Sequence, residues 1–247
     1  MPFTFAHPAI ILPLPFLNKR WFSLTGLIIG SMIPDFEYFI RMRIQSIYSH
    51  TIAGVFWFDL PLALFISFIF HNKVKNLLFN NLPYCLQSRF LIFTTFNWNN
   101  YFKQNWIVVF FSILIGTASH LLWDSFTHDS GYFVNHIAAL QNSIYLFGID
   151  IPILKIAQHL STFLGGVIIF FAIFKLPKNA ISRNPVNKNY WFATFLFFVL
   201  ILILRFFAGI GIKEYGNIIV SVISAVLLSL ILTSIFLMQK HRIKISK

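Results

Sequence analysis

Three polar residues recur at every fourth position at the end of a long apolar run: His120, Asp124 and His128. On an α-helix a step of four residues leaves a side chain only about 40° round from the previous one, so all three are expected on one side of a helix. Imidazole and carboxylate groups are ligands for zinc and related divalent ions. Polar groups at membrane depth are costly and usually face a protein interior, where they carry a function. The spacing therefore favours a metal site.

The N-terminal part of the chain adds three more candidate ligands. His7 precedes Pro8, Asp35 follows Pro34, and His50 comes just before an apolar run. Pro34 is expected to place Asp35 near a helix end or break, where a carboxylate can turn into a cavity. Each of these residues alone could simply cap a helix, but together they favour one composite site. The predicted metal ligands are His7, Asp35, His50, His120, Asp124 and His128.

The composition predicts an integral membrane protein. Of the 247 residues, 57% are hydrophobic and only 11% are charged, and the mean hydropathy is +0.75. A soluble domain of this size would carry roughly 25% charged residues. Cys85 is the single cysteine, which excludes an intrachain disulfide and a cysteine-based metal cluster.

Apolar segments of about 20 residues, the length needed to cross a bilayer, predict the fold. Pro8–Leu17 is too short and too rich in proline to span, and is expected to be a re-entrant or interfacial segment. The polar stretch Lys175–Lys188, with two prolines, predicts a boundary between residues 1–175, which hold the candidate site, and a C-terminal helix pair in residues 176–247. The predicted fold is all-α, a polytopic membrane bundle of about six transmembrane helices. The predicted spans are Trp21–Ile40, Thr51–Phe70, Trp106–Trp123, Ile156–Phe174, Trp191–Ile212 and Asn217–Met238.

The basic residues predict the orientation of the chain. The formal net charge is +12, and Lys and Arg stand in short clusters between apolar spans, which suits orientation signals better than nucleic-acid binding. With the basic C-terminal tail in the cytoplasm, most loop Lys and Arg residues also fall inside, as the positive-inside rule requires. Arg205 is expected to snorkel to the outer interface. All six candidate ligands then lie at the extracytoplasmic end. The outer loops receive only Arg41, Arg43, Lys155 and Lys213.

Four segments carry a family resemblance: FTFAHP, GSMIPDFEYF, YSHTIAGVFWFDLP and GTASHLLWDSFTHDSGYFV. They closely resemble the bacterial membrane proteins grouped as domain of unknown function 4184 (DUF4184). That family in turn resembles inner-membrane metal-dependent hydrolases with the same His, Pro-Asp, Ser-His and His-x-x-x-Asp order, and is remotely similar to zinc-dependent phospholipase C and the P1-type nucleases. The resemblance covers roughly residues 1–175 and implies a bacterial inner-membrane location. The matching ligands are His7, Asp35, His50, His120 and Asp124, with His128 at the SFTH end of the motif.

Zinc is the expected metal, and its chemistry needs a general base. Bound zinc lowers the pKa of its water from about 15.7 toward 7, which gives a hydroxide nucleophile at neutral pH. A carboxylate outside the ligand set could then accept a proton. Glu37 and Asp59 are the candidates. Asp59 lies nine positions after His50, about half a turn out of phase on one continuous helix, but the following Pro61 could break that phase.

The predicted function is a membrane-bound metal-dependent hydrolase at the extracytoplasmic face. Arg41 and Arg43 could hold a phosphate group, so the expected substrate is a phosphoester of a membrane lipid or a lipid-linked molecule. A metal-ion or proton transporter is the first alternative, but the inner halves of the spans are almost wholly apolar. A non-catalytic membrane scaffold is the second alternative, and it would need none of the observed spacing.

Overall fold

The computed structural model describes residues 3–18, 20–146, 148–178, 185–209 and 214–245. Most of these residues lie in helices, and a single antiparallel hairpin is the sheet within the described ranges. The prediction of an all-α fold is confirmed. The chain divides into two compact units, which are described separately. Unit 1 comprises Met1–Asp35, Tyr48–Leu64 and Asn105–Lys175, and unit 2 comprises Phe36–Ile47, Phe65–Gln104 and Leu176–Lys247.

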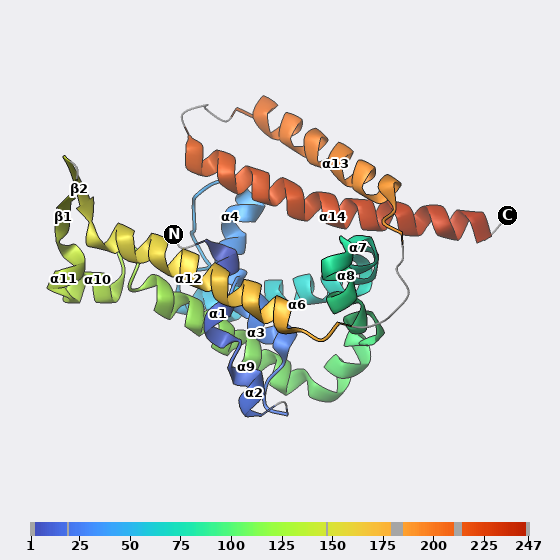
Figure 1. Cartoon of the computed structure of the whole chain (residues 1–247), viewed down its shortest axis with the longest axis horizontal. Coiled ribbons are helices and arrows are strands. Elements are labelled where there is room, and N and C mark those ends of the chain that lie inside the picture. The colour runs from blue at the N-terminus through green and yellow to red at the C-terminus, as the bar shows by residue number, and fades with distance from the viewer. Residues whose placement is uncertain (1–2, 19, 147, 179–184, 210–213, 246–247) are drawn as a thin grey trace. The chain divides into compact units, whose positions relative to one another are not determined.

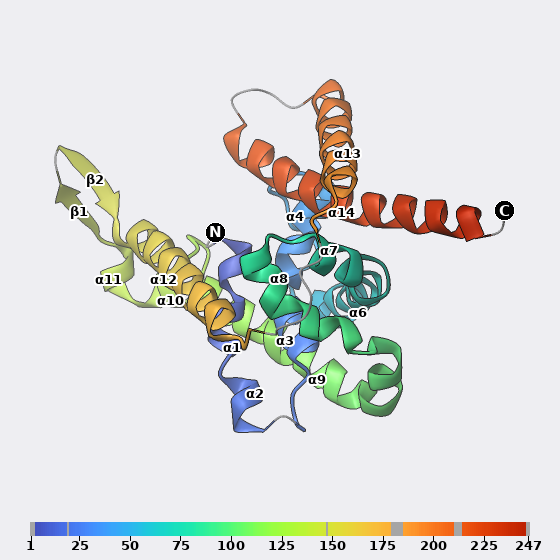
Figure 2. The same cartoon turned by 45° about the vertical axis from the view of Figure 1, so that its right-hand side comes forward.

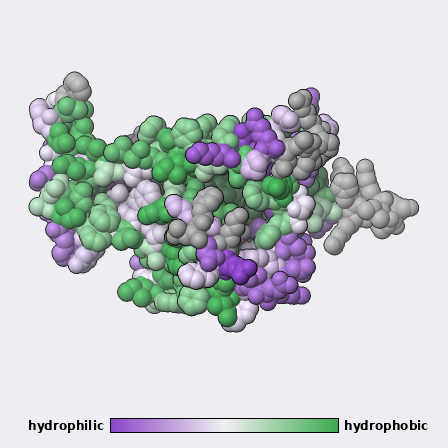
Figure 3. Space-filling model, turned by 60° about the horizontal axis from the view of Figure 1, so that its bottom comes forward, coloured by the Kyte–Doolittle hydropathy of each residue, from purple (hydrophilic) through white to green (hydrophobic). Residues whose placement is uncertain are grey.

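Apolar helices of spanning length identify an integral membrane protein. Large apolar side chains such as Phe163 and Phe195 are exposed on them, as expected for surfaces that face lipid. Figure 3 shows how much of one face of the molecule is covered by apolar side chains. Five helices among the described residues are long and apolar enough to cross a membrane: Ile52–Asn81, Trp98–Asp124, Ile153–Lys175, Lys188–Phe207 and Tyr215–Gln239.

The first predicted span, Trp21–Ile40, differs from the prediction because it is broken into short helices. Ser23 caps the first of them, its hydroxyl accepting a hydrogen bond from the Gly26 amide at 3.2 Å. The break falls at Pro34, which has no amide hydrogen and restricts the residue before it. As predicted, Asp35 lies at this break. The elements of the N-terminal part are η1 (Thr4–Ala6), α1 (Pro8–Ile11), α2 (Leu14–Leu17), α3 (Leu24–Gly30), the 3-10 helix η2 (Ile33–Asp35) and α4 (Phe36–Arg41).

The helix that follows, Ile52–Asn81, contains two π-helical segments. The first ends at Asp59, two residues before Pro61. A proline inside a helix removes one backbone hydrogen bond, and a π-bulge is one way to absorb the change. The helix therefore does not keep a regular phase between His50 and Asp59. Its elements are α5 (Ile52–Gly54), η3 (Val55–Asp59), α6 (Leu60–Ile69), η4 (Phe70–Val74) and α7 (Lys75–Asn81), followed by α8 (Tyr84–Phe90) and η5 (Leu91–Thr95).

In unit 1, helix α3 packs closely against the long helix α9 (Trp98–Asp124). Gly30 and Gly116 allow this approach, because a Cβ atom at position 116 would lie 2.5 Å from the carbonyl oxygen of Leu27. The hydroxyl of Thr117 donates to the carbonyl oxygen of Gly30 at 3.3 Å. This crossing brings the backbone after α3 to the face of α9 that carries the candidate ligands.

The rest of unit 1 leads from α9 to helix α12. A short hairpin with Gly148 in its turn at φ +82° precedes α12, and it extends from the N-terminal end of that helix in both ribbon views (Figures 1 and 2). Helix α12 packs against η1 and α1, the N-terminal segment that carries His7. The elements are α10 (Tyr132–His136), α11 (Ala138–Gln141), β1 (Ser143–Leu146), β2 (Ile149–Pro152) and α12 (Ile153–Lys175).

Unit 2 is built on the two C-terminal helices, α13 (Lys188–Phe207) and α14 (Tyr215–Ile245), which lie side by side (Figure 1). The Ser224 hydroxyl on α14 donates to the carbonyl oxygen of Phe39 at 2.7 Å, which ties α14 to α4. Trp191 on α13 donates its indole N–H to the carbonyl oxygen of Asn81 at 2.7 Å. The predicted C-terminal helix pair is thus present, and residues 36–47 and 65–104 belong to the same compact unit.

Candidate metal centre

Helix α9 supplies two of the candidate ligands, one turn apart. His120 Nε2 lies 3.2 Å from Asp124 Oδ2. The helix ends at Asp124, but the amide of His128 still donates to the Asp124 carbonyl at 3.0 Å, so one more turn follows. This turn places His128 Nδ1 3.3 Å from Asp124 Oδ2. The predicted one-sided arrangement of the three residues is observed.

Asp35 approaches these residues from the break after α3. Its side chain is fully buried, and Oδ2 accepts a hydrogen bond from the Thr4 hydroxyl at 2.5 Å. The other oxygen, Oδ1, lies 3.6 Å from His120 Nε2. One carboxylate oxygen is therefore anchored, while the other faces the cluster.

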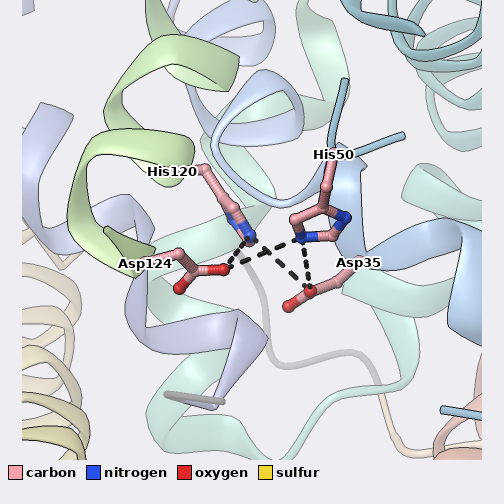
Figure 4. Close-up of side chains that lie close together, drawn as sticks. All are labelled: Asp35, His50, His120 and Asp124. Atoms are coloured by element: carbon pink, nitrogen blue, oxygen red, sulfur yellow. Dashed lines mark ion pairs between the residues drawn. The ribbon is translucent and has the colours of Figure 1, made fainter. Parts of the chain in front are cut away.

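His50 completes a group of four. It stands just before Thr51, whose hydroxyl caps α5 by accepting from the Gly54 amide at 2.9 Å. His50 Nε2 lies 3.9 Å from Asp35 Oδ1 and 3.7 Å from Asp124 Oδ2. Figure 4 shows these side chains pointing toward one another. One ligand atom from each of four residues lies within 4.8 Å of the other three: Asp35, His50, His120 and Asp124.

His7 lies on the other side of Asp124. Its ring stacks on the His120 ring with centroids 3.8 Å apart, and its Nε2 lies 3.6 Å from Asp124 Oδ1. Asp124 Oδ2 faces His50, His120 and His128 instead. The two oxygens of Asp124 thus face different histidines, which is an arrangement that allows a carboxylate to bridge two ions.

The polar atoms of this cluster fit a metal better than they fit one another. Buried nitrogen or oxygen atoms of His7, Asp35, His120 and Asp124 make no hydrogen bond of proper distance and angle with any part of the chain that the structure describes. Such groups are costly to bury unless something binds them. Ligands of one zinc ion, each about 2.0–2.2 Å from it, lie some 3–4 Å apart, which matches the separations found here.

The tautomer of His120 is set by a backbone carbonyl. His120 Nδ1 lies 2.8 Å from the carbonyl oxygen of Ser31, which can only accept, so Nδ1 carries the proton. In the neutral ring the lone pair is then on Nε2, the atom that faces Asp35 and Asp124. This is the outer-shell arrangement that commonly orients a metal-binding histidine.

Burial favours the neutral form of two further histidines. Burial, and secondarily the neighbouring His120, lowers the pKa of His7 to about 3. Burial also lowers the pKa of His128, against the opposing effect of Asp124. A neutral imidazole is the form that binds metal.

Glu37 has a different environment. It belongs to unit 2, and its Oε1 accepts from Arg41 Nε at 2.9 Å and from the Ile47 amide at 3.0 Å. Its Oε2 accepts from the Ser46 hydroxyl at 3.2 Å. The carboxylate ties the residues after α4 to that helix.

Asp59 is in unit 1 with the cluster. It is fully buried, and it ends η3, the π-helical segment that packs against η2 with Asp35. The irregular phase caused by the π-helix is what makes this position differ from the one expected on a continuous helix.

Two residues of the cluster's surroundings were not predicted from the sequence, Thr4 and Ser31. Thr4 stands in FTFAHP and Ser31 in GSMIPD, so both lie close to predicted ligands in the chain. Proximity to a ligand is a weak signal, however. Ser31 acts through its backbone carbonyl, which no residue type would reveal.

The chain belongs to the family described as Domain of unknown function (DUF4184), which matches residues 1–235. The match confirms the family resemblance and carries it past residue 175 into α14. No curated protein and no solved structure matches the chain. The family description states no activity, so the resemblance to metal-dependent hydrolases and to phospholipase C stays a prediction.

Proposed function

We propose that this member of the DUF4184 family is a membrane-bound metal-dependent hydrolase that cleaves a phosphoester of a lipid or lipid-linked substrate. The observation that carries the proposal is the group of four ligand atoms within 4.8 Å of one another, from residues far apart in the chain. The proposed ligands are Asp35, His50, His120 and Asp124, with His7 and His128 beside Asp124.

The surroundings of the ligands suit a preorganised site. The Ser31 carbonyl fixes the tautomer of His120, and the Thr4 hydroxyl holds one oxygen of Asp35. Ligands held in this way lose little conformational freedom on binding. Bound zinc or a related divalent ion supplies a Lewis acid and a water of lowered pKa.

The exposure of the ligands indicates where a substrate would approach. The side chains of His50 and His128 are 22% and 25% exposed, whereas those of His7, Asp35 and His120 are almost completely buried. The open side of the cluster is therefore between His50 and His128. In the proposed reaction a water oxygen bonds to phosphorus, the ester P–O bond breaks, and the departing alcohol oxygen takes a proton.

Asp59 is our candidate for the residue that accepts the proton from water. It is buried in the segment that packs against η2, within the same compact unit as the ligands. The carboxylate of Glu37 is instead held by Arg41, Ser46 and Ile47 in unit 2. We therefore assign Glu37 a structural role in the proposal.

The location follows from the same positive-inside count that orients the chain. We place the centre at the extracytoplasmic face of a bacterial inner membrane, with the C-terminus in the cytoplasm. A substrate drawn from the membrane suits a protein whose helices face lipid.

Metal content and phosphoester hydrolysis, measured on the same preparations, test the proposal. We expect detergent-purified protein to hold zinc or a related metal near stoichiometric amounts and to hydrolyse bis(p-nitrophenyl) phosphate or phosphatidylglycerol. Asp124→Asn should lose both properties. Asp129→Asn is the matched control, because Asp129 is exposed and pairs only loosely with Lys155 at 3.6 Å. Metal retention without hydrolysis of these probes would overturn the hydrolase and leave a metal-binding protein.

A further inference from the structure

A second polar feature lies in unit 2, in an open hollow of about 470 Å³. Every charged residue that lines it is an arginine. One lining arginine comes from α13 in the C-terminal pair, and the others come from the end of α4 and the residues after it. The lining residues are Ile40, Arg41, Met42, Arg43, Gln45 and Arg205.

The hollow is shaped by an unusual end to helix α4. Met42 adopts φ 50°, in the left-handed region that residues other than glycine seldom enter. Its carbonyl oxygen accepts from Arg205 Nη2 at 3.1 Å and from the Ser221 hydroxyl at 3.2 Å. The amide of Ile44 donates to Asn217 Oδ1 at 2.8 Å. Helices α13 and α14 thus hold the turn that presents the arginines.

The positive charge of the hollow exceeds what its neighbours neutralise. Glu37 pairs with Arg41 at 2.8 Å, so three arginines and one carboxylate leave two positive charges. The Nε atom of Arg205 is buried and makes no hydrogen bond with the described part of the chain. A buried guanidinium N–H without an acceptor is costly, and an anionic ligand would satisfy it. Arg43 is exposed and can reach such a ligand from the open side.

The position of Arg205 favours a lipid as the source of that anion. It lies two residues before Phe207, the last residue of the apolar helix α13, where a span meets the membrane interface. A second hollow of about 400 Å³ on the same helix is lined wholly by apolar side chains, among them Leu202 and Phe206. Guanidinium groups bind phosphate bidentately, and an apolar surface beside them suits an acyl chain.

We propose that Arg41, Arg43 and Arg205 bind the phosphate group of an anionic membrane phospholipid, whose acyl chain lies along α13. This lipid site is separate from the candidate metal centre and does not depend on the proposed hydrolase activity. It gives the protein a bound lipid that need not be its substrate.

Native mass spectrometry of the detergent-solubilised protein with added phosphatidylglycerol tests the lipid site. We expect retention of phosphatidylglycerol but not of diacylglycerol, which lacks the phosphate. Arg43→Gln should weaken retention about 10-fold, the effect of losing one charge-assisted contact. Arg20→Gln is the matched control, because Arg20 is exposed and lies outside the hollow. Arg205→Lys, which keeps the charge but loses the planar fork, should also weaken retention.

The remaining arms separate the alternatives. Inorganic phosphate at millimolar concentration should displace little lipid, whereas complete displacement would mean that the site takes free phosphate and would overturn the lipid assignment. Equal retention by wild type and Arg43→Gln, with unchanged melting temperature, would overturn the arginine site. Asp124→Asn should keep the bound lipid, so failure of the hydrolase and failure of the lipid site can be told apart.

Discussion

His120 and Ser31 are joined by a hydrogen bond across 89 positions of sequence, from the His120 ring Nδ1 to the Ser31 carbonyl oxygen at 2.8 Å. The bond exists because α3 and α9 cross closely at Gly30 and Gly116. It turns Nε2 of His120 toward Asp35 and Asp124. A packing contact between two helices thereby sets the chemistry of one side chain.

The anchor of Asp35 gives the first prediction. Thr4→Val removes the hydroxyl that donates to Asp35 Oδ2 and leaves a side chain of similar shape. We expect the affinity for zinc to fall about 10- to 100-fold, as is usual when an outer-shell partner of a ligand is lost. A competition titration against a chromogenic chelator measures this.

Ser119→Ala is the matched control for the Thr4 variant. The Ser119 hydroxyl donates to the Gly116 carbonyl on its own helix at 2.7 Å, so zinc affinity should stay near that of wild type. If both variants lose affinity equally, the effect is a general loss of packing and the anchoring role of Thr4 is wrong.

The burial of His7 predicts a pH dependence of stability in the metal-free protein. The folded-state pKa of His7 is about 3, below the ordinary value of 6.5, so between these two pH values the unfolded chain binds the extra proton. Stability from this residue is complete above pH 6.5 and falls as the pH drops toward 3, by at most about 1.4 kcal/mol per pH unit. His7→Gln should flatten this part of the profile of melting temperature against pH.

His136→Gln serves as the control for the His7 variant, because His136 is exposed. Its profile should follow that of wild type in the presence of a chelator. A His7→Gln profile as steep as that of wild type would show that His7 is not buried in its neutral form.

The local part of the candidate site could be predicted from the sequence, because a four-residue spacing on a helix fixes which side chains share a face. That reasoning placed His120, Asp124 and His128 together, and the structure has their groups 3.2–3.3 Å apart. Pro34 likewise indicated that Asp35 stands at a break. The outer-shell roles of Thr4 and Ser31 depend on tertiary contacts, and no spacing within one segment contains them.

The fold shows the same limit. Average hydropathy over Trp21–Ile40 indicates a spanning helix, but it does not weigh a single proline against twenty apolar neighbours. The break at Pro34 shortens α3 to seven residues. Asp59 illustrates the point again, since the phase that it takes depends on a π-helical segment and not on the count of nine residues from His50.

The close crossing of α3 and α9 predicts the effect of a single added methyl group. Gly116→Ala places a Cβ atom 2.5 Å from the Leu27 carbonyl oxygen and 2.6 Å from the Ser31 amide nitrogen, so the helices must separate. We expect a lower melting temperature and weaker zinc binding, since the Ser31 carbonyl moves away from His120.

Gly166→Ala is the control for this change, because a Cβ atom at Gly166 of α12 meets nothing within 4 Å among the described residues. The substitution should be neutral or stabilising by about 0.5–1 kcal/mol, the usual gain from replacing glycine inside a helix. Equal effects of the two substitutions would contradict the role assigned to the crossing.

The orientation of the chain predicts the accessibility of its one cysteine. Cys85 is exposed on α8 and makes no disulfide, so its thiol can report which side of the membrane it occupies. With the basic loops inside, Cys85 should resist a membrane-impermeant maleimide added to intact cells and react after the cells are opened. A Cys85→Ser variant with a new cysteine at exposed Ser143 in β1, on the opposite side by the same count, should give the reverse pattern. Labelling of Cys85 in intact cells would invert the topology and place the candidate metal centre at the cytoplasmic face.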